Sequence, residues 1–240
     1  MKNNNEVNNL EKENLKKEQT NSRNKNNKKK LWIIISIVIA IVIAGRIVYH
    51  RFFYCNHSVD KPIIYLYPKE EIKLSVKLGK EYNITSSYPK YENGWNVIAK
   101  PDGTLVDIET GRNLYALYWE GVNSEECNIT EGFVVKENET IEFLEEKLSI
   151  LGLNEREAEE FIVYWLPILQ ENEYNYIRFA TLEEINNNMP LELSVEPDTL
   201  IRVLMQYKPL NKYIEVKEQK LTTPERKGFT VVEWGGTKIK

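Results

Sequence analysis

Histidine and cysteine are scarce in this chain, each occurring only twice among 240 residues. The sequence contains no C-x-x-C pair and no H-E-x-x-H signature, so a zinc site with the usual ligand spacing is excluded. Asp102-Gly103 and Asp107 lack the dense alternating ligands of a known calcium loop and favour a hairpin turn. We therefore expect no metal ion.

Glycine-rich signatures are also missing. The chain has none of the patterns G-x-x-x-x-G-K-[ST], G-x-G-x-x-G or G-x-S-x-G, which mark nucleotide sites and ordinary hydrolases. A serine or cysteine nucleophile would have to use His57, which lies shortly after an apolar run at residues 31–49. We expect no cofactor and no nucleophilic catalysis of the familiar kinds.

One long apolar run is present, at residues 31–49, directly behind a lysine-rich leader. A helix of this length rises roughly 28 Å at about 1.5 Å per residue, which is close to the hydrocarbon thickness of a bilayer. Basic residues are dense before the run and sparse after it, which predicts a cytoplasmic amino terminus. We therefore expect a single-pass protein of the cell membrane, in contact with the lipid bilayer.

The alternative interpretation of the run is a cleaved secretory signal, with Val42-Ile-Ala44 as the small-residue cleavage site. The long polar leader and the long apolar core favour a retained anchor.

Composition divides the chain further. Residues 1–30 carry nine Lys or Arg and four Asp or Glu, a charge of about +5, and are too polar to fold. The whole chain is −4, which leaves −9 for residues 31–240 and argues against binding nucleic acid. The predicted order is a disordered cytoplasmic leader, a transmembrane helix at 31–49, a stalk at 50–60 and an extracytoplasmic domain at 61–240, with a possible sub-boundary near 137.

Both cysteines fall on the outer side. In an oxidising compartment Cys55 and Cys127 are able to form one disulfide that ties the stalk to the domain. Two separate thiols are the alternative, and the sequence leaves the choice open.

The outer domain changes its hydrophobic period along the chain. Between 61 and 136, short alternating runs such as Ile72-Lys-Leu-Ser-Val-Lys-Leu78 predict strands separated by turns. Between 140 and 171 the spacing becomes helical, with Gly152 between two helices and Asn154 as the cap of the second. Strands return after Tyr174. We expect an α+β fold, with a mainly antiparallel sheet, sandwich-like or open, and a helical hairpin packed on it.

The same domain carries four distinctive motifs: Lys61-Pro-Ile-Ile-Tyr-Leu-Tyr-Pro68, Tyr118-Trp-Glu-Gly121, Tyr164-Trp-Leu-Pro167 and Val231-Val-Glu-Trp-Gly-Gly236. Together they resemble an uncharacterised bacterial family of secreted or membrane-anchored proteins. The resemblance covers nearly the whole outer domain and none of the leader. It implies kinship and no particular activity, ligand or catalytic residue.

Two carboxylates are candidates for catalysis. Glu120 follows Trp119, and Glu233 precedes Trp234. An acid beside an aromatic ring at a strand end is able to have a raised pKa, and two such acids are able to cleave a glycosidic bond. The alternative is structural: both acids cap strands or pair with Lys or Arg.

Aromatic residues supply the stronger candidate for binding. Flat rings with polar handles stack on sugars or receive a peptide when they lie exposed on one sheet face. The alternative is a core role, because at least half of the rings on alternating strands point inward. The candidate ligand-binding residues are Trp95, Trp119, Trp234, Tyr65 and Tyr67.

From these observations we expect a membrane-anchored extracytoplasmic binding or interaction protein of the cell envelope. A cell-wall glycan or an envelope protein is the expected partner. The alternative function is an envelope glycan hydrolase that uses Glu120 and Glu233.

Overall fold

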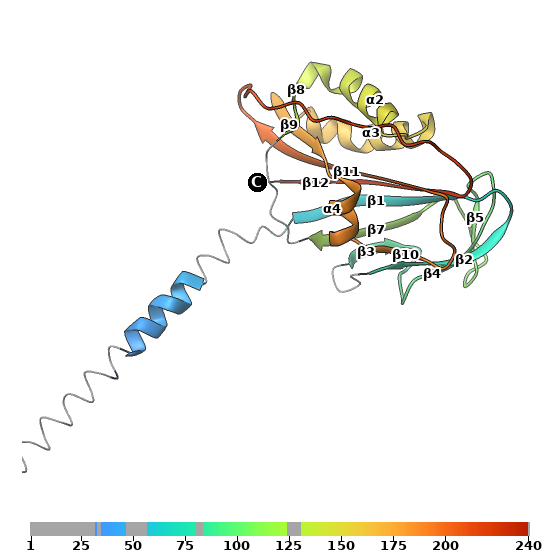
Figure 1. Ribbon diagram of the computed structural model, residues 1–240, viewed down its shortest axis with the longest axis horizontal. Coiled ribbons are helices and arrows are strands. Elements are labelled where there is room, and N and C mark those ends of the chain that lie inside the picture. Colours follow the sequence, from blue (N-terminus) through green and yellow to red (C-terminus); the bar gives the residue numbers. More distant parts are fainter. Residues whose placement is uncertain (1–31, 33–34, 47–56, 80–83, 124–130, 240) are drawn as a thin grey trace, which may run out of the picture. The chain divides into compact units, whose positions relative to one another are not determined.

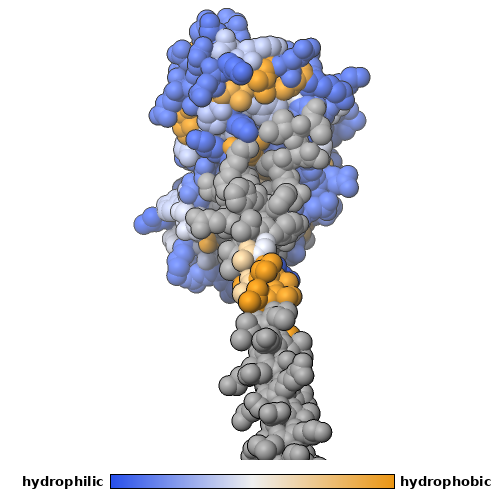
Figure 2. Space-filling view, turned by 90° about the vertical axis from the view of Figure 1, so that its left-hand side faces the viewer, coloured by the Kyte–Doolittle hydropathy of each residue, from blue (hydrophilic) through white to orange (hydrophobic). Residues whose placement is uncertain are grey.

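The structure is a computed structural model that describes residues 32, 35–46, 57–79, 84–123 and 131–239. The chain divides into two compact units, Met1–Tyr54 and Cys55–Lys240. In the first unit, Trp32 and residues 35–46 are helical, and Figure 2 shows the described residues there mostly in the colour of hydrophobic side chains. The predicted disulfide lies outside the described residues, since Cys55 and Cys127 are both beyond these ranges.

Among the residues that the structure describes, no helix reaches the length and apolar character needed to span a membrane. Several residues of the predicted span, 31–49, are not among them. The anchor stays a prediction.

The second unit is built around a seven-stranded sheet (Figure 1). Every neighbouring pair in it is antiparallel except β11 and β12, which run parallel. In spatial order its strands are β3 (Ile84–Tyr88), β7 (Leu117–Asn123), β1 (His57–Tyr67), β12 (Thr230–Lys238), β11 (Thr199–Leu210), β9 (Tyr174–Phe179) and β8 (Phe133–Lys136).

A second, five-stranded sheet is antiparallel throughout. Its order is β10 (Leu191–Leu193), β2 (Ile72–Leu78), β4 (Trp95–Ala99), β5 (Leu105–Asp107) and β6 (Asn113–Leu114). The helices of this unit are α2 (Thr140–Ile150), which follows a 3-10 turn at Glu137–Glu139, α3 (Glu155–Leu169) and α4 (Leu182–Asn188). Figure 1 shows α2 and α3 beside β8, β9 and β11, with the smaller sheet on the other side of the large one.

Strand alternation gives the large sheet two buried faces. Ile64 and Leu66 of β1 point into a core shared with the small sheet, whereas Ile63 and Tyr65 point into a core shared with the helices. Because successive side chains of a strand point to opposite faces, one central strand contributes to both cores. The result is three layers: small sheet, large sheet and helices.

The helical pair forms where the sequence predicts it. The side chain of Asn154 accepts a hydrogen bond from the backbone N–H of Glu157, and the carboxylate of Glu157 accepts one from the backbone N–H of Asn154. This reciprocal capping box fixes the start of α3. Pro167 does not end the helix, which continues to Leu169.

The predicted α+β class with mainly antiparallel sheets is confirmed. The boundaries differ in two places. Strand β1 begins at His57, inside the predicted stalk, because it pairs with β7 from that residue onward. Helix α4 was not predicted, since seven residues are too few for a helical period to be recognised.

Candidate functional site

Glu233, a predicted catalytic residue, lies between the two sheets. Its side chain is almost fully buried and pairs with Arg202, whose Nε donates to Oε2 at 2.6 Å. The indole Nε1 of Trp119 donates to Oε1 at 2.9 Å. Both carboxylate oxygens are therefore bound inside the core, which matches the structural interpretation of this acid.

Glu120, its predicted partner, points to the other side of the same sheet. Glu233 is aligned with Ile64 and, through it, with Leu117, and these residues face the small sheet. Tyr118 is aligned with Ile63 and faces the helices, so Glu120 two residues later does the same. The structure does not bring the two carboxylates to one cleft, which cleavage of a glycosidic bond requires.

Four of the five predicted ligand-binding aromatics belong to the core, and their assignment to an exposed platform is corrected here. The exposed fractions are 2% for Trp95, 5% for Trp119, 0% for Trp234 and 2% for Tyr65. Their polar atoms are also used internally: Trp95 Nε1 donates to the carbonyl of Pro89, for example. Buried rings of this kind stabilise the fold and cannot stack on a ligand. Only Tyr67 keeps a partly exposed side chain.

Tyr67 belongs to a group of five tyrosines that reach the surface, on the helix-facing side of the large sheet and on α3. We call these five residues the tyrosine surface. Tyr88 of β3 and Tyr118 of β7 are direct partners across the ladder, and Tyr88 and Tyr115 are each 51% exposed. The remaining members are partly exposed. The tyrosine surface consists of Tyr67, Tyr88, Tyr115, Tyr118 and Tyr164.

Lys61 borders this surface beside Tyr118 and Tyr164 and has an unusual backbone. Its φ is +60°, in the left-handed region that side chains other than glycine seldom adopt. The register of β1 shifts between Asp60 and Ile63, so Lys61 is part of a β-bulge. The bulge directs the Lys61 Nζ to 5.7 Å from the ring centre of Tyr118 and 5.1 Å from that of Tyr164. Both distances allow cation–π attraction.

The close packing of this bulge leaves a trace in the neighbouring strand. A Cβ atom added to Gly235 would lie 3.1 Å from the Cα of Pro62. That spacing is tight for two carbon atoms. Because Gly235 has no Cβ, the backbone of β12 lies close beside the bulge. The bulge is thus packed closely against β12 at Pro62.

One stripe of α3 borders the tyrosine surface. Arg156, Glu160 and Tyr164 are four residues apart and share one side of the helix. The Nε of Arg156 donates to Glu160 at 3.0 Å, and its guanidinium lies 5.2 Å from the ring centre of Tyr115. Glu160 also accepts a 2.6 Å hydrogen bond from the hydroxyl of buried Tyr65. The stripe is therefore fixed to the sheet by a buried tyrosine.

Tyr67 is held at the far end of the same surface. Its ring stacks in parallel on Tyr65, with centres 6.3 Å apart. The guanidinium of Arg226 lies 5.8 Å from its ring centre and also pairs with Glu157. Gly103, with φ of +84°, approaches the ring closely enough that a Cβ there would lie 2.7 Å from a ring carbon. The ring of Tyr67 is thus held between Tyr65, Arg226 and Gly103.

The electrostatic environment keeps the hydroxyl groups protonated. Burial and a hydrogen bond with Glu120 raise the pKa of Tyr118 to about 12. Burial and the charges of Asp60 and Glu120 raise the pKa of Tyr164 as well. These phenols therefore remain neutral donors and acceptors at all ordinary pH values. Both signs of charge lie near these rings: Lys61 and Arg156 are cations, and Asp60, Glu120 and Glu160 are anions.

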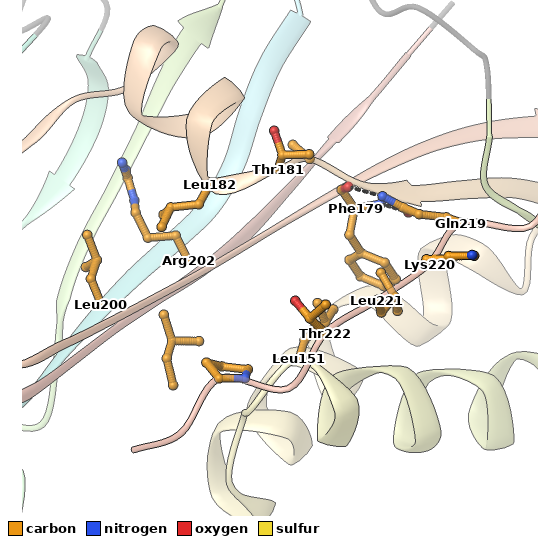
Figure 3. A pocket seen from close by; sticks show the side chains of 13 residues that line it. Leu151, Phe179, Thr181, Leu182, Leu200, Arg202, Gln219, Lys220, Leu221 and Thr222 are labelled. Carbon is orange, nitrogen blue, oxygen red and sulfur yellow. Dashed lines mark hydrogen bonds between the residues drawn. The ribbon is translucent and has the colours of Figure 1, made fainter. Parts of the chain in front are cut away.

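Elsewhere, the part of the unit that the structure describes has a cavity of about 270 Å³ beside β11 (Figure 3). It is lined largely by apolar side chains from β9, α4, β11, the residue that follows α2 and the segment after Lys217. Within the described residues, no group of three or more His, Cys, Asp or Glu side chains is placed to hold a metal ion.

Sequence reasoning missed part of the surface. The spacing of Arg156, Glu160 and Tyr164 was visible, but it did not show that the stripe lies against Tyr65 and Tyr115. The left-handed backbone of Lys61 had no signal, because its sequence neighbours do not distinguish a bulge from a straight strand.

Comparison with known proteins finds a relative of this chain. A Butyrivibrio fibrisolvens protein, described as an uncharacterised protein in the bglA 3′ region, is 33% identical to this chain over 105 residues. The aligned part covers 98% of that protein and 40% of this chain. No family model matches the chain, and no solved structure is significantly similar to it. The chain belongs to the same family as this Butyrivibrio protein.

Proposed function

We propose that this chain is a membrane-anchored binding protein of the cell envelope and that its tyrosine surface receives a glycan. The proposal rests on the backbone conformation of Lys61. Its left-handed backbone costs about 1–3 kcal/mol, and such strain persists where the surroundings impose it, often at functional sites. Here the strained residue places an amine between two partly exposed tyrosine rings.

A glycan fits the chemistry of this surface best. Sugar rings have apolar faces that stack on aromatic side chains, and their hydroxyl groups need both donors and acceptors. The tyrosine hydroxyls, Lys61 and Arg156 supply donors, while Glu120 and Glu160 supply acceptors. The balance of charge does not favour a strongly anionic ligand such as nucleic acid, which binds basic surfaces.

The location rests on the sequence. The apolar run at 31–49 is long enough for a bilayer, and the basic leader orients it with the domain outside. A domain held there meets wall glycans without a further targeting step.

The proposal is tested with the full chain in detergent micelles, mixed with purified bacterial cell-wall sacculi. The double variant Tyr88→Ala/Tyr115→Ala removes two exposed rings and should weaken retention about tenfold, because each stacked ring contributes about 0.5–1.5 kcal/mol. The control is Tyr213→Ala, which removes a ring that is 61% exposed and not part of the tyrosine surface. Retention that is equal in the double variant and the control would contradict the proposal.

The same mixture separates binding from catalysis. We expect the pelleted sacculi to retain the protein and to release no soluble glycan. Soluble fragments that disappear with Glu120→Gln would show a hydrolase and would overturn a role in binding alone.

A further inference from the structure

Strand β11 has a strand partner along only half of the edge that faces β9. Strand β9 pairs with β11 from Met205 to Leu210 and then leaves the sheet after Phe179. On this side, no described strand lies beside Thr199–Leu204, although most of these residues are buried. A buried strand edge presents backbone N–H and C=O groups that need hydrogen-bond partners.

The backbone hydrogen bonds of β11 show which of its groups face this edge. The N–H of Thr199 bonds to Phe229 and the carbonyl of Tyr207 to Ile239, so the odd-numbered residues face β12. The carbonyl of Leu204 instead accepts from the N–H of Ala180 on the other side. Because the direction alternates along a strand, the N–H and C=O groups of Leu200 and Arg202 point to the edge without a strand partner.

The cavity of about 270 Å³ lies at this edge (Figure 3). Leu200, Ile201 and Arg202 line it, and the chain that leaves β9 at Thr181 forms another wall. Two polar side chains of the lining already have partners. The carboxamide of Gln219 bonds to both the N–H and the carbonyl of Phe179, and Arg202 bonds to Glu233. Backbone groups of β11 are therefore available to an incoming molecule at this edge.

We propose that the cavity binds a short extended peptide that adds a strand to the open edge of β11. Strand addition uses backbone hydrogen bonds for affinity and pockets at alternate positions for side-chain preference. The donors and acceptors of Leu200 and Arg202 have the spacing of such a ladder. The volume lies just under the roughly 300–1,000 Å³ of small-molecule pockets, so it suits two or three residues.

The lining also defines the side chains of the peptide. On the helix side of the edge, the walls are Leu151, Ile201 and Leu221. On the other side they include Leu182 and Leu200. The preferred peptide therefore carries β-branched or other aliphatic residues at alternate positions. This site is separate from the tyrosine surface, and the inference does not depend on glycan binding.

The test follows amide exchange in the full chain in detergent micelles by nuclear magnetic resonance. The probe is a pool of capped pentapeptides Xaa-Val-Xaa-Val-Xaa at about 1 mM, enough to populate a complex of millimolar Kd. We expect the amides of Leu200 and Arg202 to exchange about tenfold more slowly with the pool present. Unchanged exchange at both amides would overturn the proposal.

Two matched variants locate the effect. Thr222→Trp places a bulky ring in the lining of the cavity and should abolish the added protection. Thr223→Trp makes the same change at the next exposed position, outside the lining, and should preserve it. Protection that survives Thr222→Trp would show that the peptides bind elsewhere and would overturn the proposal.

N-methylation of the probe distinguishes a new strand from simple apolar contact. In an added strand, only alternate peptide N–H groups bond to β11. Methylation of one alternating pair should therefore abolish protection, and methylation of the other pair should not. Equal effects of the two methylated pools would contradict strand addition.

Discussion

The side chain of Glu233 has a structural role in the core. Its carboxylate binds the guanidinium of Arg202 and the indole of Trp119 between two sheets. The opposite end of the guanidinium bonds to Asn186 of α4 at 2.9 Å. The ion pair and its two neutral partners thus connect three strands and a helix.

We predict that Glu233→Gln lowers the free energy of unfolding by about 3–5 kcal/mol, because it leaves the buried charge of Arg202 uncompensated. Urea unfolding followed by circular dichroism measures the loss. The control is Glu225→Gln, which breaks an exposed pair with Lys227 and should cost less than about 1 kcal/mol. Similar losses in both variants would show that the buried pair does not stabilise the fold.

At this scale the sequence supported only part of the result. Pairing of Glu233 with a basic residue was one of two interpretations, and nothing near position 233 indicated Arg202, which lies 31 residues earlier. The tryptophans failed as a platform for a related reason. Alternation shows which residues share a strand face, but not whether another layer covers that face.

Two capping boxes organise the helices of the domain. One starts α3, and the other starts α4, where Thr181 and Glu184 bond reciprocally through side chain and backbone. The first was predicted because a long amphipathic segment follows it. The second belongs to α4, which has seven residues. A capping sequence without a helical hydrophobic period after it was not enough to predict this helix.

The second box predicts a dependence of stability on pH. Burial alone would raise the pKa of Glu184, but hydrogen bonds from Thr181 and Arg178 outweigh it and hold that pKa below 4.5. A carboxyl whose pKa is lower in the folded state stabilises the fold above its unfolded pKa, and this contribution disappears as the pH falls through the folded value.

We therefore expect the native chain to be more stable than Glu184→Gln at pH 7, by less than about 1 kcal/mol because the carboxylate is 43% exposed. The gap should begin to shrink as the pH falls below the ordinary glutamate pKa and close as the pH falls through the lower pKa of the folded state. Urea unfolding from pH 7 to pH 3 measures it, with Glu183→Gln on the same helix as the control. A gap that stays constant from pH 7 to pH 3 would refute the assignment.

At the scale of the whole molecule, the layers decide which residues remain accessible. Helices α2 and α3 lie beside β8, β9 and β11 (Figure 1). Tyr88 of β3 and Tyr115, two residues before β7, stay exposed. This arrangement depends on β1 pairing with β12, across most of the length of the domain. The class of fold could be predicted from local hydrophobic periods. The pairing of β1 with β12 could not, because the two strands lie far apart in the sequence. For the same reason the tyrosine surface could not be predicted.

Substitution of Lys61 by glycine tests the central claim most directly. Lys61→Gly removes the amine and also relieves a left-handed backbone, which glycine adopts without steric cost. We predict retention on sacculi about five- to tenfold weaker than for the native chain, as loss of about 1 kcal/mol or slightly more of binding energy requires. The free energy of unfolding should be unchanged or higher. Full retention by a folded Lys61→Gly chain would contradict the proposal that this strained lysine serves ligand binding.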